Sequence, residues 1–433
     1  MFSKFLMLFF ALAVGPLALV AQDPQEPPRT EIELSTTAKR LAMAAPAATA
    51  SGLDANQVHR EYTETLRRDL DGIASIALLR DGLPISIAAD SFGQWLNAGV
   101  ELLVVSTLTL KNRDDVLAEA VVYDVRSGRR VTSIAHNGNL HGFRRLAHLV
   151  SDSIEEYLTG APGIANTRII FCKEESPGVK EIYQVDRDGS NLTRLTNHKT
   201  LTLSPTVARD GRLAYLTYKP NPEIWGQKTP GGQHVKLYPQ KEDGWVNVYS
   251  PSFCPDGSRI AFVQADGNGD TDIMVLDIST GRVRKLTSQN GLNSEISWNP
   301  AGNQMAFTSG RDGSPSIYLM EDDGTNVRRL GIDGPYNASP AWSPDGSMIA
   351  FVSRFEDNFD LFVYRLGDPT PYQITTGFTN SENPAWSPDS RHLIFSSTRD
   401  GKNRLYITDL SGTKSERVLN NTGCQQPAWL RQR

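Results

Sequence analysis

Residues 339–346 read Ser-Pro-Ala-Trp-Ser-Pro-Asp-Gly, and related segments recur from residue 204 to the end of the 433-residue chain. Each copy carries one large apolar residue that serves as a marker. Successive markers are 46, 45, 44, 44 and 43 residues apart, at Val207, Phe253, Trp298, Trp342, Trp386 and Trp429. A repeat of about 40–50 residues is typical of a β-propeller blade or a similar solenoid unit.

Each repeat contains four short segments that predict strands. The first ends at the marker, and Pro344-Asp345-Gly346 then predicts a tight hairpin turn, because proline presets one φ angle and glycine permits a positive one. Segments 349–352, 360–363 and 373–375 are rich in β-branched and aromatic residues and predict the second, third and fourth strands. Four strands per repeat match one propeller blade.

The two ends of the repeat region complement each other. Segments 168–171, 181–184 and 194–196 predict strands two to four with no first strand before them, whereas 427–429 is a first strand with nothing after it. Joining both ends in one shared blade, in addition to five complete repeats, predicts a six-bladed propeller over residues 163–433. The pairing would also remove the exposed strand edges of a linear array.

The first 21 residues predict a secretory signal peptide. Lys4 precedes an apolar run from Phe5 to Val20, and small residues stand before Gln22. A membrane anchor is the weaker interpretation, because the run is shorter than the ~20 residues that a spanning helix needs. We therefore expect an exported protein that does not itself span a membrane.

Residues 22–162 predict an N-terminal arm followed by a small α/β domain. Apolar residues at helical spacing alternate with strand-like segments, a pattern typical of α/β proteins. Helices are expected over 54–70, 92–98 and 142–158, and strands over 73–79, 101–110, 117–123 and 130–134. The predicted fold class is therefore multidomain, with α/β and all-β parts joined by the Gly-Ala-Pro-Gly linker at 160–163.

Composition and motifs disfavour several functions. The net charge of -5 with interspersed signs offers no basic stripe for nucleic acid. The chain contains no Gly-x-Ser-x-Gly elbow, no His-Glu-x-x-His, no phosphate loop and no dinucleotide fingerprint. We expect a protein that is not an enzyme and that carries no cofactor.

One acidic loop is a weak candidate for a metal site. Its side-chain oxygens alternate at Asp266, Asn268, Asp270 and Asp272, which resembles a calcium loop. Other repeats carry polar turns at the same place, such as 311–314, so the loop is first of all the turn between the second and third strands.

Two of the three cysteines predict a disulfide. With the 337–353 hairpin as a template, Cys172 corresponds to Val352 and Cys424 to Asn337, which lie close across the first two strands. In an oxidising compartment such a pair would clasp the shared blade.

Polar residues precede the markers at the starts of the innermost strands. By the symmetry of a propeller they converge on one mouth of the central channel, where they suit a protein loop or a small polar ligand. They are Asn293, Ser294, Glu295, Asn337, Ser339, Asn380, Ser381, Glu382, Asn383, Gln425 and Gln426.

The order of these features resembles the TolB family of the Tol-Pal system over essentially the whole mature chain. The resemblance is carried by the signal peptide, the α/β domain, the junction 158–160 leading to 167–169, and the Pro-Asp-Gly repeats. It implies a monomeric periplasmic scaffold for outer-membrane integrity and constriction at cell division. In that family the mouth opposite the α/β domain receives Pal, an outer-membrane lipoprotein, which implies contacts here at Ser250, Ser294, Glu295, Ser339, Asn383 and Gln426.

The family's N-terminal arm binds the inner-membrane protein TolA, which implies a contact here through Ile32, Glu33 and Leu34. Two other classes of function stay open from the residues alone. One is a propeller module of a peptidase or lyase, and the other is a sensor that binds a small ligand or a metal ion in the channel.

Overall fold

The computed structural model describes residues 39–44, 53–73, 76–78, 92–112, 114–240, 246–266, 269–288, 291–355, 357–377 and 379–431. The predicted signal peptide and the arm residues Ile32, Glu33 and Leu34 lie outside these ranges. The described residues belong to one compact unit. Across the described ranges, no helix combines the length and the apolar character needed to cross a bilayer.

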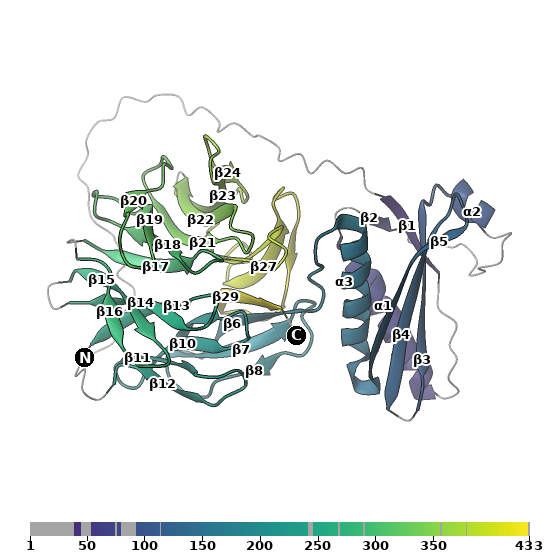
Figure 1. The fold of residues 1–433 in the computed structure, drawn as a ribbon, viewed down its shortest axis with the longest axis horizontal. Helices are drawn as coiled ribbons and strands as arrows, with labels where there is room; N and C mark the ends of the chain where they lie inside the picture. Colours follow the sequence, from purple (N-terminus) through teal and green to yellow (C-terminus); the bar gives the residue numbers. More distant parts are fainter. Residues whose placement is uncertain are drawn as a thin grey trace. The chain divides into compact units, whose positions relative to one another are not determined.

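The N-terminal part contains a five-stranded sheet with the order β2-β1-β3-β4-β5 (Figure 1). β1 runs parallel to both β2 and β3, whereas β3, β4 and β5 are antiparallel. The strands are β1 (Lys39–Ala44), β2 (Ile76–Leu78), β3 (Leu102–Leu110), β4 (Asp115–Asp124) and β5 (Arg129–Asn139).

Helices α1 (Leu53–Asp71) and α3 (Phe143–Thr159) share one hydrophobic core with this sheet. Leu66 of α1 and Val150 of α3 are fully buried there, as the helical spacing of apolar residues predicts. Helix α2 (Phe92–Asn97) places Trp95 in a second hydrophobic cluster, which includes residues of β1 and β3. Gly160 ends α3 with a left-handed φ of 72°, which glycine adopts without a steric penalty.

The remaining described residues form six four-stranded antiparallel sheets, the architecture of a β-propeller. The innermost strands are β9 (Thr202–Val207), β13 (Asn247–Phe253), β17 (Asn293–Trp298), β21 (Asn337–Trp342), β25 (Ser381–Trp386) and β29 (Cys424–Arg431). The second strands are β10 (Leu213–Tyr218), β14 (Arg259–Ala265), β18 (Gln304–Ser309), β22 (Met348–Phe355), β26 (His392–Ser397) and β6 (Thr167–Ser176). The third are β11 (Pro222–Gln227), β15 (Thr271–Asp277), β19 (Ser316–Glu321), β23 (Asn358–Arg365), β27 (Arg404–Asp409) and β7 (Val179–Asp186). The fourth are β12 (His234–Tyr238), β16 (Val283–Lys285), β20 (Arg328–Arg329), β24 (Tyr372–Gln373), β28 (Ser415–Arg417) and β8 (Thr193–Arg194).

The marker residues of the repeat lie between neighbouring sheets. Trp298 is 5% exposed and donates its indole N–H to the carbonyl of Ser252, one sheet earlier, at 3.1 Å. Trp386 makes the equivalent bond to Ala341 at 2.8 Å. The tryptophans therefore combine apolar burial with a satisfied polar atom, which buried indoles require.

The last strand belongs to the same sheet as the first strands of the repeat region. β29 pairs antiparallel with β6, with Trp429 opposite Ile169 and Arg431 opposite Thr167. Trp429 is 7% exposed and donates its indole N–H to Thr167 Oγ1 at 2.8 Å. The innermost strands also contact one another in the order β9, β13, β17, β21, β25 and β29, and β29 contacts β9.

The predicted disulfide between Cys172 and Cys424 is wrong, because both thiols are free and buried. Cys172 lies opposite Gln425, whereas Cys424 lies opposite Lys173. Since successive side chains on a strand point to opposite faces, the two thiols enter different core clusters. The template failed by one position, because Asn337 pairs with Ser353 and not with Val352.

All three cysteines are free thiols in the structure, and we expect the same in the exported protein. Alkylation of the denatured chain without a reductant should therefore add three labels, at Cys172, Cys254 and Cys424. Mass spectrometry of peptides would measure the labelling, and an oxidised pair joining 172 and 424 would contradict the observed register.

Removing the Trp429 side chain should destabilise the protein strongly. Trp429→Ala leaves a cavity and removes the hydrogen bond that Thr167 Oγ1 accepts from the indole, and we expect a loss of about 3–5 kcal/mol in the free energy of unfolding. Urea unfolding followed by circular dichroism measures the change. Leu192→Ala, at a residue that is 39% exposed, is the control, and equal losses in both variants would contradict the packing described for Trp429.

Candidate functional site

One residue near the start of each innermost strand has a left-handed backbone. These six residues, which we call the αL ring, have φ values between 47° and 54°. They are Ser204, Ser250, Glu295, Ser339, Asn383 and Gln426. A left-handed conformation costs about 1–2 kcal/mol for a residue other than glycine. Because it recurs at the same place in six sheets, the fold itself imposes this conformation.

A β-bulge accompanies every member of the αL ring. The pairing between innermost and second strand shifts register at this point in all six sheets. The sequence explains the position, because in five of the six copies the next residue is proline, which cannot donate to the strand ladder. A bulge leaves one residue unpaired and redirects its side chain, and bulges often lie beside functional sites.

Side-chain oxygens bridge two pairs of ring residues in neighbouring sheets. The Glu295 carboxylate accepts hydrogen bonds from the backbone N–H and the hydroxyl of Ser339, both at 2.8 Å, and from Thr308 Oγ1 at 3.0 Å. The amide oxygen of Gln426 accepts the backbone N–H of Ser204 at 2.9 Å. In both pairs the backbone N–H of a ring residue binds an oxygen presented by the ring residue of the adjacent sheet.

One sector of the ring is acidic. Burial raises the pKa of Glu382, next to ring residue Asn383, and the charge of Glu295 raises it further. Burial also raises the pKa of Tyr336 to about 12, and the two carboxylates add to this effect. These groups therefore share one electrostatic environment, in which an additional negative charge would be unfavourable.

Most of the polar residues that the sequence predicts at the channel mouth fall into two groups, ring members and residues that directly precede them. Ser250, Glu295, Ser339, Asn383 and Gln426 are ring members, and Ser294, Glu382 and Gln425 precede ring members and are half-buried. Ser204 is the sixth ring member and was missing from the predicted contacts, although its Ser-Pro step matches the repeat.

Asn293, Asn337 and Ser381 differ from the half-buried residues above because they are only 2%, 1% and 2% exposed. Asn293 donates to the carbonyl of Thr271 at 2.6 Å and accepts the Ser309 hydroxyl at 2.9 Å. Its side chain therefore fixes the start of β17 and is shielded from solvent.

In the acidic loop at 266–272, Asp270 and Asp272 contact groups of the protein itself. Asp270 accepts the backbone N–H of Gly291 at 3.1 Å, and Asp272 lies 2.5 Å from the Lys285 ammonium. Asn268 lies outside the described residues. In the described part of the chain, no group of three His, Cys, Asp or Glu residues could hold a metal ion.

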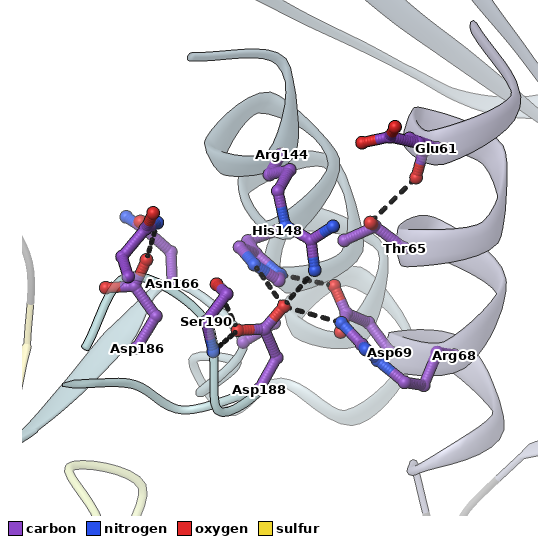
Figure 2. A network of polar contacts seen from close by, with 12 residues as sticks. Glu61, Thr65, Arg68, Asp69, Arg144, His148, Asn166, Asp186, Asp188 and Ser190 are labelled. Atoms are coloured by element: carbon purple, nitrogen blue, oxygen red, sulfur yellow. Dashed lines mark hydrogen bonds and ion pairs between the residues drawn. The ribbon is translucent and has the colours of Figure 1, made fainter. Parts of the chain in front are cut away.

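A second polar cluster lies where α3 meets the turn between β7 and β8 (Figure 2). Asp188, whose side chain has no solvent exposure, accepts hydrogen bonds from Arg68 at 2.6 Å and from Arg144 at 2.8 Å. His148 Nδ1 lies 2.6 Å from Asp69 Oδ2. Burial opposes the charge of His148, but the nearby carboxylates of Asp188 and Asp69 outweigh burial and raise its pKa to about 9.

The left-handed backbone at Ser250 predicts an unusual order of substitutions. Ser250→Gly should be more stable than Ser250→Val by about 1–3 kcal/mol, because a β-branched residue is strained at this φ. At Ser252, on the same strand and outside the ring, valine should equal or exceed glycine because it favours strands. Urea unfolding of the four variants measures this, and the same order at both positions would contradict the ring geometry.

Comparisons with known proteins agree with this architecture. A family model described as the TolB beta propeller domain matches residues 155–432. The chain is 33% identical to the Tol-Pal system protein TolB of Anaeromyxobacter dehalogenans, over 66% of this chain and 67% of that one. It is 29% identical to the TolB homolog of Chlorobium chlorochromatii, over 58% of this chain and 57% of that one.

A crystal structure of TolB from Acinetobacter baumannii superposes with a TM-score of 0.80 at 25% identity, covering 91% of this chain and 97% of the other. The sequence matches thus span about two thirds or less of the curated relatives, whereas the structural match spans nearly the whole of both chains. The family model covers more than half of this sequence. The chain therefore belongs to the TolB family.

Proposed function

We propose that this chain is a non-enzymatic periplasmic scaffold of the Tol-Pal system. In this proposal the αL ring binds a Pal-like, peptidoglycan-associated lipoprotein of the outer membrane. The N-terminal arm, through Ile32, Glu33 and Leu34, binds a TolA-like protein of the inner membrane. The resulting link supports outer-membrane integrity and constriction during cell division. The name of the relative from Anaeromyxobacter dehalogenans, Tol-Pal system protein TolB, supports the assignment to the Tol-Pal system.

The proposal includes a closed propeller of six blades over residues 163–433, after a signal peptide at 1–21 and an α/β domain within 22–162. Two observations support it. The six innermost strands contact one another in a cycle, and β29 from the end of the chain completes the sheet of β6, β7 and β8. Closure would place the six ring residues around one mouth.

The contact between Glu295 and Ser339 is the observation that carries the binding proposal. It is an example within the protein of how the ring binds an oxygen. Ser339 donates both its backbone N–H and its side-chain hydroxyl to the Glu295 carboxylate. Among the described residues, side-chain oxygens meet the backbone N–H groups of two ring members, Ser339 and Ser204. In our proposal a partner loop presents carbonyl, amide or carboxylate oxygens to other members of the ring.

The position of the α/β domain supports an accessible ring. α3 contacts the β7–β8 turn through Asp188 and lies near the β25–β26 turn, where the charge of Asp389 acts on Glu155. Both turns lie at the ends of the strands remote from the ring residues, which stand near the starts of the innermost strands. The α/β domain and a partner at the ring would then use different ends of the propeller.

Charge substitutions beside the ring test the proposed site. Ser294→Arg and Glu382→Arg should each reduce capture of a Pal-like lipoprotein at least about tenfold, because they add bulk and alter charge next to ring residues. The measurement is a pull-down from detergent-solubilised envelopes with quantitative mass spectrometry. Val235→Arg, on the outer strand β12, introduces the same side chain at an exposed position and is the matched control.

The control should capture the lipoprotein as the unmodified protein does. If the unmodified protein captures no peptidoglycan-associated lipoprotein, the scaffold proposal fails. If it captures the lipoprotein and both ring variants do so equally well, only the location of the site fails. Turnover of a peptide or an acidic polysaccharide by the pure protein would instead favour the peptidase or lyase module. Metal ions retained after dialysis would favour the sensor.

A further inference from the structure

Helix α3 has two chemically different faces. Its apolar face, which includes Val150 and Ile154, packs against the five-stranded sheet. Four ionisable residues at intervals of three or four form a stripe along another face. We call Arg144, His148, Asp152 and Glu155 the α3 stripe. The neighbours of this stripe include residues of the propeller. Ionisable groups therefore join the α/β domain to the propeller, whereas apolar tryptophans join the propeller sheets to one another.

The first half of the stripe surrounds Asp188 of the β7–β8 turn (Figure 2). Arg144 donates to the Asp188 carboxylate, and His148 Nε2 lies 3.6 Å from the same oxygen. Helix α1 contributes Arg68, which also donates to Asp188, and Asp69, which contacts the other nitrogen of His148. His148 is 3% exposed, so its charge depends on these neighbours rather than on water.

The second half of the stripe faces the segment before β6 and the β25–β26 hairpin. Asp152 accepts the backbone N–H groups of Ala165 at 2.7 Å and of Asn166 at 3.0 Å, directly before β6. Glu155 is 8% exposed. The charges that act on Glu155 come from Asp389 and His392 of the β25–β26 hairpin, from Asp152 and from Arg187, which itself pairs with Glu416 at 3.4 Å.

We infer that the α3 stripe is a proton-controlled latch that holds the α/β domain on the propeller in mildly acidic surroundings and loosens as the pH rises. This inference concerns regulation and does not depend on the partners proposed above. Interfaces between domains that are polar rather than apolar commonly permit relative motion. Here three of the polar groups, His148, Asp152 and Glu155, bind a proton more tightly when the α/β domain is docked on the propeller than when the two are separated.

The sign of the linkage is the same for all three groups. Asp188 supplies part of the rise of the His148 pKa from 6.5 to about 9, whereas Asp69 belongs to the α/β domain and stays beside His148 when the two parts separate. The contribution from Asp188 is present while His148 is protonated and is lost as the pH rises through 9. Burial, and then the charge of Asp389, raise the pKa of Glu155 from 4.5 to about 7. Its ionisation therefore penalises the docked state progressively from pH 4.5 to 7.

Burial likewise raises the pKa of Asp152 to about 6, although two backbone N–H groups oppose this effect. The docked state consequently binds more protons than the separated state across the range from pH 5 to 9. Asp188 and Asp389 do not reverse this sign. Burial opposes their ionisation, but their hydrogen bonds lower the pKa of each, so both are ionised throughout that range.

Hydrogen exchange of the full-length protein tests the latch. The opening constant is the exchange rate divided by the intrinsic rate at each pH, measured for peptides that cover 160–166 and 186–190. We expect this constant to increase at least about tenfold between pH 6 and pH 8.5. The reason is that an opening reaction that releases one proton becomes about tenfold more favourable per pH unit. A peptide from β18 reports on the interior of the propeller and should show no comparable increase.

A matched pair of variants identifies the stripe as the cause. Glu155→Gln removes an ionisable group from the stripe and should reduce the increase between pH 6 and pH 8.5 at least about threefold. Glu156→Gln makes the same change at the exposed adjacent residue and should behave as the unmodified protein. An opening constant that does not rise with pH, or identical profiles for the two variants, would overturn the inference.

Discussion

The pairing of β29 with β6 is the interaction on which the propeller depends. It joins residues near the end of the chain to residues at the start of the repeat region, and it supplies the innermost strand that the sheet of β6, β7 and β8 otherwise lacks. Without it, the sheet would expose an unpaired edge and the Trp429 indole would lose its partner Thr167. Among the described strands, every other innermost strand precedes the rest of its own sheet in sequence, and there only this pairing brings distant segments into one sheet of the propeller.

The same sheet carries a residue of the αL ring and a residue that binds the α3 stripe. Gln426 of the αL ring lies on β29, and Asp188, which binds the α3 stripe, lies in the turn after β7. Asp152 of α3 also holds the backbone immediately before β6. We further propose that occupancy of the ring alters how the N-terminal arm is presented, and this sheet provides a covalent and hydrogen-bonded connection between the ring and the α/β domain.

Much of the fold follows from the sequence because its signals are periodic. The spacing of the marker residues located the innermost strands, since the same side chain must fill the same gap between sheets in each repeat. The helical spacing of apolar residues located α1 and α3 to within a few residues, since one face of each must cover the sheet. The resemblance to the TolB family, inferred from the order of these features, is confirmed by the family model and the curated relatives.

The errors and omissions have a local cause. A left-handed residue before proline inserts a bulge, and the bulge changes which residues face each other across the strands. Hydropathy carries no signal for this change, so the register of Cys424 and the place of Ser204 in the ring could not be read from it. The sequence predicts helix α3 but not the contacts of its stripe, because the partner Asp188 lies 40 residues beyond His148 in a turn between two strands.

The pairing at the ends of the chain can be tested directly by native-state hydrogen exchange resolved to individual strands. If β29 closes the propeller, its paired amides should exchange as slowly as those of β25, because both would open only when the propeller unfolds. Exchange of β29 at least about a hundredfold faster than β25 under the same conditions would contradict closure. It would show instead that the final strand detaches while the rest of the propeller stays folded.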